Sequence, residues 1–210
     1  MNRRSFHRAP EWERRQELLE ATLDCIAEQG LQGATVRQIA VRAGVTAGLI
    51  RHYFESKDML VAAAYRQLVK TFAVRAASIE GDPRARLREF LVRNLTAPIS
   101  NSRSLSLWAA FISQVHVDPD LGAIHREGYL GFLDDIQQLL RDFLAAEGRM
   151  VDAPECRRLS IAINAVIDGL WLEGCLAGDL FHEAELVRIA LTSTEAILGL
   201  PLGASEDTEE

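Results

Sequence analysis

The chain has few cysteines and no leader-like segment. Its 210 residues include only Cys25, Cys156 and Cys175, and no two of them form a CxxC pair. An odd number of widely spaced cysteines is typical of reduced thiols in a cytoplasm rather than of a disulfide framework. Arginines near the start are not followed by an apolar run, so the sequence predicts no signal peptide and a cytoplasmic protein.

Long hydrophobic runs and catalytic motifs are also scarce. The most apolar stretch, residues 159–172, is interrupted by polar residues and is shorter than a bilayer span. The sequence shows no pairing of a nucleophile with a general base, no metal-binding motif and no phosphate-binding loop. Their absence argues against an enzyme. His116, Asp118 and His125 lie near one another, but their spacing fits no zinc pattern. We therefore expect no catalytic residue, no metal and no cofactor.

Six prolines and 14 glycines argue against a loop-rich chain, and 48% hydrophobic residues suffice for a buried core. Apolar residues recur at three- and four-residue intervals, which predicts an all-α fold. The segment from Asp58 to about Glu80 contains no Pro or Gly before Gly81, so we expect one long helix there. This helix should join the N-terminal part of the chain to the C-terminal part as a rigid lever. The other expected helices cover residues 11–29, 35–43, 46–54, 84–97, 105–115, 120–147, 154–177 and 183–198.

Residues 34–57 have the pattern of two short helices joined by a tight turn. Thr35 and Gln38 have capping-box spacing, Gly44 can end the first helix, and Thr46 can cap the second. Such a helix-turn-helix sets its second helix into the major groove of DNA.

Positive charge gathers at this end of the chain. Residues 1–70 carry 11 Lys and Arg against 8 acids, whereas residues 71–210 carry 12 against 22, which gives the net charge of −7. The asymmetry favours nucleic acid at one end only. Residues 31–54 contain no acid and three bases, Arg37, Arg42 and Arg51.

The segment ATVRQIAVRAGVTAGLIRHYFESKDML, residues 34–60, resembles the DNA-binding signature of the TetR family of bacterial transcriptional regulators. The resemblance extends over about residues 14–64. It implies an all-helical homodimer with an N-terminal three-helix DNA-binding domain and a larger C-terminal ligand-binding and dimerisation domain. AVIDGLWL, residues 165–172, is similar to the choline-responsive, BetI-like branch of this family.

The chain is therefore expected to have four parts. These are a flexible basic arm at 1–10, the helix-turn-helix domain at 11–57 (14–74 by the family's usual boundary), a helical ligand-binding and dimerisation domain at 58–200, and a disordered acidic tail at 201–210. The arm is expected to reach the DNA backbone or minor groove, or else to be a frayed terminus with incidental charge.

The resemblance also implies a set of DNA contacts. Arg51 stands where the family often has Tyr, so its expected role, donating two hydrogen bonds to guanine, follows from its chemistry alone. The expected DNA-binding residues are Thr35, Arg37, Thr46, Ala47, Gly48, Leu49, Arg51, His52, Tyr53 and Lys57.

Asn164, Asp168 and Trp171 recur at i, i+4 and i+7, so they share one face of an apolar helix. Buried polar groups need partners, and a cationic ligand would supply one for Asp168, with Trp108, Phe111 and Trp171 as ring faces. The alternative is that Asp168 and Asn164 bond to neighbouring helices or across a dimer.

The last two helices have wide apolar sides, and the resemblance implies that they form a four-helix interface with their symmetry mates. The expected interface residues are Gly169, Gly174, Leu186, Ile189, Ala190, Ser193 and Ile197.

Together these features predict a ligand-responsive repressor that binds a palindromic double-stranded operator as a homodimer, with recognition helices ~34 Å apart. Its expected partners are the operator, a second copy of itself and a small-molecule effector, with no membrane. The BetI-like resemblance implies choline or betaine metabolism. Two alternatives stay open: a helix-turn-helix regulator without a ligand, and an enzyme on a helical bundle.

Overall fold

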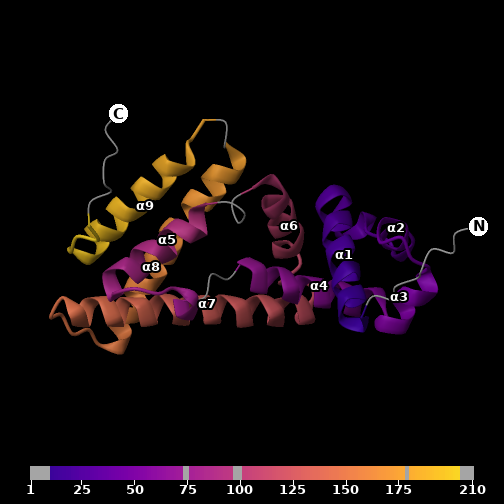
Figure 1. The fold of residues 1–210 in the computed structure, drawn as a ribbon, viewed down its shortest axis with the longest axis horizontal. Coiled ribbons are helices and arrows are strands. Elements are labelled where there is room, and N and C mark those ends of the chain that lie inside the picture. The colour runs from indigo at the N-terminus through magenta and orange to yellow at the C-terminus, as the bar shows by residue number, and fades with distance from the viewer. Residues whose placement is uncertain (1–9, 73–75, 97–100, 178–179, 204–210) are drawn as a thin grey trace, which may run out of the picture. The chain divides into compact units, whose positions relative to one another are not determined.

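The computed structural model describes residues 10–72, 76–96, 101–177 and 180–203 (Figure 1). Within these residues the chain forms nine α-helices, one 3-10 helix and no strand, so the predicted all-α fold class is confirmed. Nearly all of the expected basic arm and residues 204–210 of the expected acidic tail lie outside the described residues. The helices are α1 (Glu11–Gly33), α2 (Val36–Arg42), α3 (Ala47–Tyr53), α4 (Lys57–Phe72), η1 (Ala76–Ser78), α5 (Pro83–Leu95), α6 (Ser102–Ile112), α7 (Pro119–Ala146), α8 (Ala153–Leu176) and α9 (Glu183–Leu198).

Side-chain caps define the two short helices as the sequence predicted. The Thr35 hydroxyl accepts a hydrogen bond from the Gln38 backbone N–H, and the Gln38 side chain accepts one from the Thr35 N–H in return. The Thr46 hydroxyl accepts from the Leu49 N–H at the start of α3. Gly44 has a φ of 64°, a left-handed conformation that suits glycine best. These local bonds fix the turn between α2 and α3.

Aspartate and asparagine side chains cap the later helices. The carboxylate of Asp82 accepts from the Ala85 N–H, and that of Asp152 accepts from the Glu155 N–H. Asp118, which stands near two histidines in the sequence, accepts from the first N–H groups of α7 and is therefore a helix cap. Asn101 accepts from the Ser104 N–H, which explains why α6 starts earlier than we expected.

The chain divides into two compact units. The first comprises Met1–Leu68 and Ser106–Ile124, and the second comprises Val69–Leu105 and His125–Glu210. The expected domain division at residue 57 follows the helix-turn-helix alone. The compact division falls after Leu68 instead. Most of α4 and of α6 belongs with the first unit.

Buried side chains from successive helices build the first unit. Leu18 of α1, Ile39 of α2 and Ile50 of α3 are almost completely shielded from solvent. Tyr65 of α4 stacks on Phe111 of α6 with ring centroids 4.1 Å apart and an interplanar angle of 11°. Burial raises the pKa of Tyr65 to about 12, so this phenol stays neutral at physiological pH.

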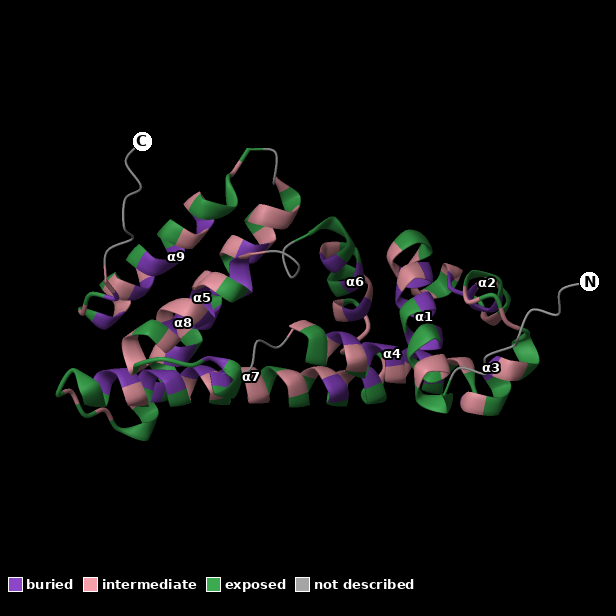
Figure 2. Cartoon of the chain, viewed as in Figure 1, coloured by how far each residue is buried: buried purple, intermediate pink, exposed green. Residues whose placement is uncertain are grey.

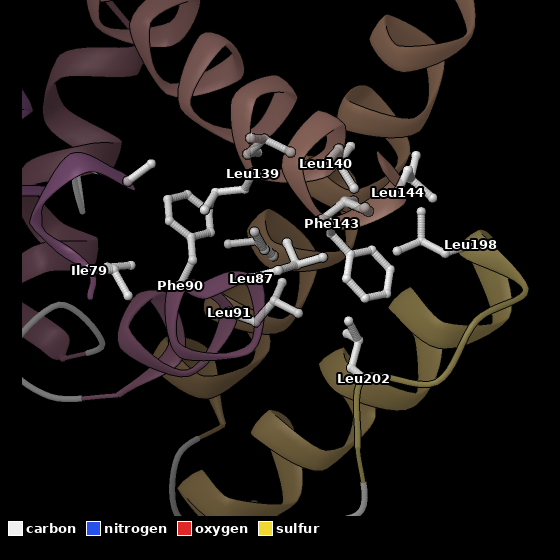
Figure 3. Packing of buried hydrophobic residues seen from close by; sticks show 14 of the residues in the cluster. Ile79, Leu87, Phe90, Leu91, Leu139, Leu140, Phe143, Leu144, Leu198 and Leu202 are labelled. Atoms are coloured by element: carbon white, nitrogen blue, oxygen red, sulfur yellow. The ribbon is translucent and has the colours of Figure 1, made fainter. Parts of the chain in front are cut away.

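The second unit has its main core where α5, α7 and α9 meet (Figure 3). Phe90 of α5, Phe143 of α7 and Leu198 of α9 belong to this cluster, and Phe90 and Phe143 are fully buried. Burial of an aromatic or aliphatic side chain of this size stabilises a fold by about 1.5–3 kcal/mol. This core anchors the helices that position the candidate ligand site on α8.

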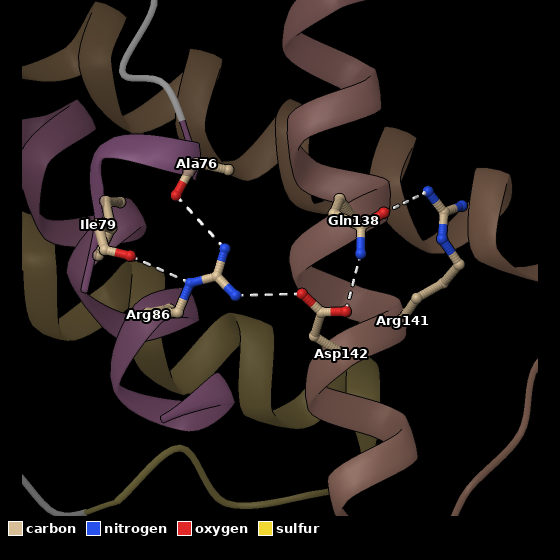
Figure 4. A network of polar contacts seen from close by, with 6 residues as sticks. All are labelled: Ala76, Ile79, Arg86, Gln138, Arg141 and Asp142. Carbon is tan, nitrogen blue, oxygen red and sulfur yellow. Dashed lines mark hydrogen bonds and ion pairs between the residues drawn. The ribbon is translucent and has the colours of Figure 1, made fainter. Parts of the chain in front are cut away.

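The long helix that we predicted from Asp58 to about Glu80 does not reach that far. The described part of α4 ends at Phe72, and residues 76–78 form a separate 3-10 turn. Ala76 and Ile79 are buried in the second unit's core, and their carbonyl oxygens accept hydrogen bonds from Arg86 of α5 (Figure 4). The expected uninterrupted lever is therefore wrong, because tertiary burial and these bonds outweigh the helix propensity of an alanine-rich segment.

Arg86 also forms an ion pair with Asp142 of α7 at 3.1 Å. We expect Arg86→Ala to lower the free energy of unfolding by about 1–3 kcal/mol, because the Ile79 carbonyl loses the donor described here and the Ala76 carbonyl and the Asp142 carboxylate each lose one of two donors. Urea denaturation monitored by circular dichroism measures this change. Arg93→Ala, on the same helix, removes only an exposed pair with Glu89 and should cost less than about 0.5 kcal/mol. Equal losses in the two variants would contradict this role for Arg86.

Candidate DNA-binding surface and ligand site

The helix α3 is anchored by one side and exposes the other. Ile50 and Phe54 are buried, and the guanidinium of Arg15 lies 5.1 Å from the centre of the Phe54 ring. Most of the expected DNA-binding residues are exposed, and none is buried. The exposed ones are Thr35, Arg37, Thr46, Ala47, Gly48, Arg51 and His52, and the half-buried ones are Leu49, Tyr53 and Lys57.

Three of these side chains already have bonds within the protein. The hydroxyls of Thr35 and Thr46 cap α2 and α3. The Thr35 hydroxyl also donates to Gln38 Oε1 at 2.7 Å, so a phosphate contact from Thr35 would have to replace that bond, whereas one from Thr46 would use its hydroxyl proton. Lys57 donates from Nζ to the Leu31 carbonyl oxygen at 3.0 Å. This bond ties the start of α4 to the segment that follows the break in α1 at Gly30, where φ is 71°. An ammonium has three donors, so Lys57 can hold this carbonyl and a phosphate together.

Arg42 differs from the other two arginines of this region. Its guanidinium pairs with Glu28, and it also lies 3.6 Å from the Asp24 carboxylate, both on α1. The bond with Glu28 raises the pKa of Arg42. The sequence placed Arg42 on a uniformly positive surface, but its charge is balanced within the protein. The positive charge of the helix-turn-helix is therefore carried mainly by Arg37 and Arg51.

Cys25 lies beside this ion-pair cluster. The thiol is buried, and burial raises its pKa even though the Arg42 guanidinium acts in the opposite direction. A thiol in this state is a core residue, because the reactive thiolate is disfavoured.

On α8, the expected polar pair is in direct contact. Asn164 is buried and donates from Nδ2 to Asp168 Oδ2 at 2.8 Å. Trp171, one turn further on, is also buried, and its ring lies 6.4 Å from that of Phe72 at the end of α4. The three α8 residues thus lie on one side of the helix. The alternative, in which Asn164 and Asp168 bond to neighbouring helices or across a dimer, stays open.

Asp168 is exposed in the single chain, although its neighbours restrict the hydration of its carboxylate. This desolvation raises the pKa of Asp168, while the Asn164 bond and the charge of His125 on α7 lower it. Sequence spacing identified Asn164 as a neighbour of Asp168 but missed Phe72 and His125. Both lie far from α8 in the chain, so no local periodicity could reveal them.

Trp108 and Phe111 belong to the first unit, whereas Asn164, Asp168 and Trp171 belong to the second. Phe111 is fully buried, and one face of its ring is covered by Tyr65. The pocket that we expected these five residues to share stays a prediction. Within the described residues, no group of three or more His, Cys, Asp or Glu side chains is arranged to hold a metal ion.

The expected interface residues fall into two groups. Leu186 and Ala190 are buried within the chain, so the surface open to a partner lies elsewhere on α9. Ile189 is 40% exposed, and a methyl group at Gly169 would meet nothing within 4 Å. The remaining expected residues, Gly174, Ser193 and Ile197, are half-buried.

Among the described helices, α8 alone is long and apolar enough to cross a membrane by length and composition. Its 24 residues exceed the apolar stretch that we judged too short. Only 22% of its most apolar window is buried inside the chain. It packs against α5 and α9, and its Asn164 and Asp168 side chains bond to each other.

Two family models match the chain. One, described as "Bacterial regulatory proteins, tetR family", covers residues 18–64, and the other, described as "BetI-type transcriptional repressor, C-terminal", covers residues 83–199. The chain belongs to the TetR family of transcriptional regulators, in its BetI-type branch. TetR-family regulators bind DNA operators and function as dimers.

Individual relatives agree with this assignment. The regulator BetI of Paraburkholderia phytofirmans is 32% identical over 189 residues, which are 88% of this chain and 93% of that protein. A crystal structure of a protein from Pseudomonas aeruginosa PAO1, assigned as a transcriptional regulator, has a TM-score of 0.80 at 30% identity, covering 93% of this chain and 95% of that one. A regulator from Saccharomonospora viridis, solved with choline, shares the fold with a TM-score of 0.70 at 20% identity, covering 86% and 94%.

Arg42 is ion-paired within the protein and Arg51 is exposed, and this difference can be tested by DNA binding. We expect Arg51→Ala to weaken operator binding by about 10-fold or more, because a bidentate base contact contributes about 1–3 kcal/mol. Arg42→Ala should leave the salt dependence of binding unchanged, because Glu28 and Asp24 already neutralise its guanidinium. Fluorescence anisotropy over a salt series measures both. A larger loss for Arg42→Ala than for Arg51→Ala, with both variants folded, would reverse this assignment.

Proposed function

We propose that this BetI-type regulator is a ligand-responsive repressor that binds a palindromic operator as a homodimer and is released by a small organic cation. The exposed face of α3 with its uncompensated Arg51 supports the operator contact. The Asn164–Asp168 pair beside the Trp171 and Phe72 rings supports the cation and carries the proposal. Such a protein acts in the cytoplasm, where its operator lies.

A second copy of the chain is the proposed cover for α8 and α9. The exposed apolar residues on these helices include Ile161, Leu176 and Ile189, and Gly169 allows close approach of another helix (Figure 2). An apolar surface left open on a helix of this length is unfavourable in water. Burying it against its symmetry mate would remove that cost and hold two α3 helices at a fixed spacing.

A quaternary ammonium compound such as choline fits the chemistry of the α8 site. Asp168 provides a carboxylate whose bond to Asn164 fixes one oxygen. The rings of Trp171 and Phe72 provide the aromatic faces on which quaternary ammonium groups bind well. Choline bound to the S. viridis regulator makes it the first compound to test.

Release from DNA would follow from differential affinity. A cation that binds more tightly to a dimer whose α3 helices have the wrong spacing lowers operator affinity by the ratio of its two binding constants. Phe72 is the last described residue of α4, and it lies beside Trp171. A ligand that shifts Trp171 would therefore act directly on the end of α4.

The dimer surface can be tested by placing a charge on it. We expect Ile189→Asp to raise the dimer dissociation constant by about 100-fold, because an unpaired carboxylate would be buried in the interface. Sedimentation equilibrium measures this constant, and circular dichroism checks the fold. Met150→Asp is the matched control, since Met150 is 85% exposed and lies outside α8 and α9. A variant Ile189→Asp that remains dimeric would exclude this surface.

The effector site can be tested with two compounds of the same shape. We expect choline to bind by calorimetry, and its neutral isostere 3,3-dimethyl-1-butanol to bind at least ~10-fold more weakly, since it lacks the charge that Asp168 and the rings attract. Asp168→Asn should remove the preference for choline. Lowering the pH should weaken choline binding, because a raised pKa makes Asp168 lose its charge at a higher pH than an ordinary carboxylate.

Glu173→Gln, an exposed acidic residue of the same helix, serves as the control for charge alone. No choline binding at millimolar concentration would exclude choline itself. Equal affinity for choline and for the neutral compound would exclude a cation site at Asp168.

A further inference from the structure

The last turn of α4 lies unusually close to α7. A Cβ atom added to Gly128 would stand 2.2 Å from Val69 Cγ1 and 3.6 Å from Val69 Cβ. Real Cβ contacts essentially never come below 3.0 Å, so any other residue at position 128 requires α4 or the Val69 side chain to move. Both residues belong to the second unit.

Backbone conformation does not explain this glycine. Gly128 lies inside α7 and is absent from the glycines with positive φ among the described residues. In a helix interior, glycine costs about 1 kcal/mol relative to alanine. The approach of Val69 Cγ1 is therefore the feature that a larger residue at position 128 would disturb.

A second contact holds the same turn of α4. Phe72 follows Val69 by three residues, so the two side chains lie on neighbouring positions of one helix face. The Phe72 ring lies 6.4 Å from the Trp171 ring at an interplanar angle of 56°. The end of α4 thus has two supports within the second unit, Gly128 on α7 and Trp171 on α8.

Two supports on one turn constrain that turn of α4 within the second unit. α4 is one helix from Lys57 to Phe72, and the boundary between the compact units falls within it, after Leu68. We propose that Gly128 is a positioning residue for operator binding: the close approach of Val69 to its bare backbone sets the direction of α4 and, through α4, the placement of the reading helix. This inference rests on operator binding but not on the identity of the effector.

The geometry of a helix indicates how large the effect would be. A shift of about 1 Å at Val69, with Phe72 fixed about 4.5 Å further along the axis, would move the start of α4, about 22 Å from Phe72, by roughly 5 Å. Recognition helices of a dimer must match half-sites one DNA turn apart, so an error of this size in each copy would disturb both contacts.

α7 itself provides a matched control. Gly131 lies one turn from Gly128 in the same helix, and a Cβ added there would meet nothing within 4 Å. Gly128→Ala and Gly131→Ala introduce the same methyl group and the same gain in helix propensity. Only the first places that methyl against α4.

The experiment measures operator affinity by fluorescence anisotropy and the melting temperature of four variants. They are Gly128→Ala, Gly131→Ala, Val69→Ala and the double variant Val69→Ala/Gly128→Ala. We expect Gly128→Ala to lose about 10-fold or more in affinity, Val69→Ala about 3-fold through loss of its support, and the double variant to return within about 2-fold of wild type, because the two side chains are directly coupled. Gly131→Ala should bind as wild type does.

Recovery in the double variant distinguishes positioning from general damage to the fold. A folded Gly128→Ala variant with wild-type affinity would overturn the proposal, and so would a double variant weaker than both single ones. If Gly128→Ala does not fold, the comparison of Val69→Ala with the double variant decides, since a methyl at position 128 should then restore affinity. Wild type and Gly131→Ala in the same assay show whether operator binding itself is intact.

Discussion

The guanidinium of Arg86 fixes the position of residues 76–79, the segment that follows α4 in the second unit. It binds the carbonyl oxygens of Ala76 and Ile79 and the carboxylate of Asp142, so one side chain of α5 fixes the segment after α4 and joins it to α7. The Ala76 carbonyl also accepts from the Ile79 N–H, so Arg86 is an additional donor there, whereas Arg86 is the donor that we find for the Ile79 carbonyl within the described residues. The last described turn of α4 is in turn positioned by contacts with α7 and α8.

The helix α8 serves three purposes with three of its sides. One side, which includes Ile163 and Ile167, belongs to the main core of the second unit. A second carries the Asn164–Asp168 pair and Trp171, which lies beside the end of α4. A third exposes Ile161 and Gly169 to a proposed second copy of the chain. A helix used on all sides must be apolar nearly throughout, which explains why its composition is close to that of a membrane span.

Features that depend on neighbours in sequence were predictable. The capping box of Thr35 and Gln38 and the cap at Thr46 involve residues three apart, and the spacing of Asn164 and Asp168 placed them in contact. The BetI-type assignment rested on the same kind of local pattern. Such signals survive without knowledge of the tertiary structure because the helix itself brings the residues together.

Features that depend on distant partners were not predictable. The end of α4 follows from Arg86 and Asp142, which are 56 residues apart in the chain. Arg42 was counted with the positive charge of the helix-turn-helix because residues 31–54 contain no acid, yet its partners Asp24 and Glu28 come from the preceding helix. Phe72 and His125 escaped notice as neighbours of the α8 site for the same reason.

The internal pairing of Arg42 has a consequence for how the protein finds its operator. Non-specific affinity for DNA rises with the number of cations free to neutralise phosphates, and a genome offers about 10⁶–10⁹ competing sites. In this protein one of the three arginines of the helix-turn-helix is paired within the chain, and the net charge of the chain is −7. It would therefore dissociate quickly from DNA of random sequence. Fewer copies of the regulator would then be held away from the operator, so a small cellular pool could suffice to keep it occupied.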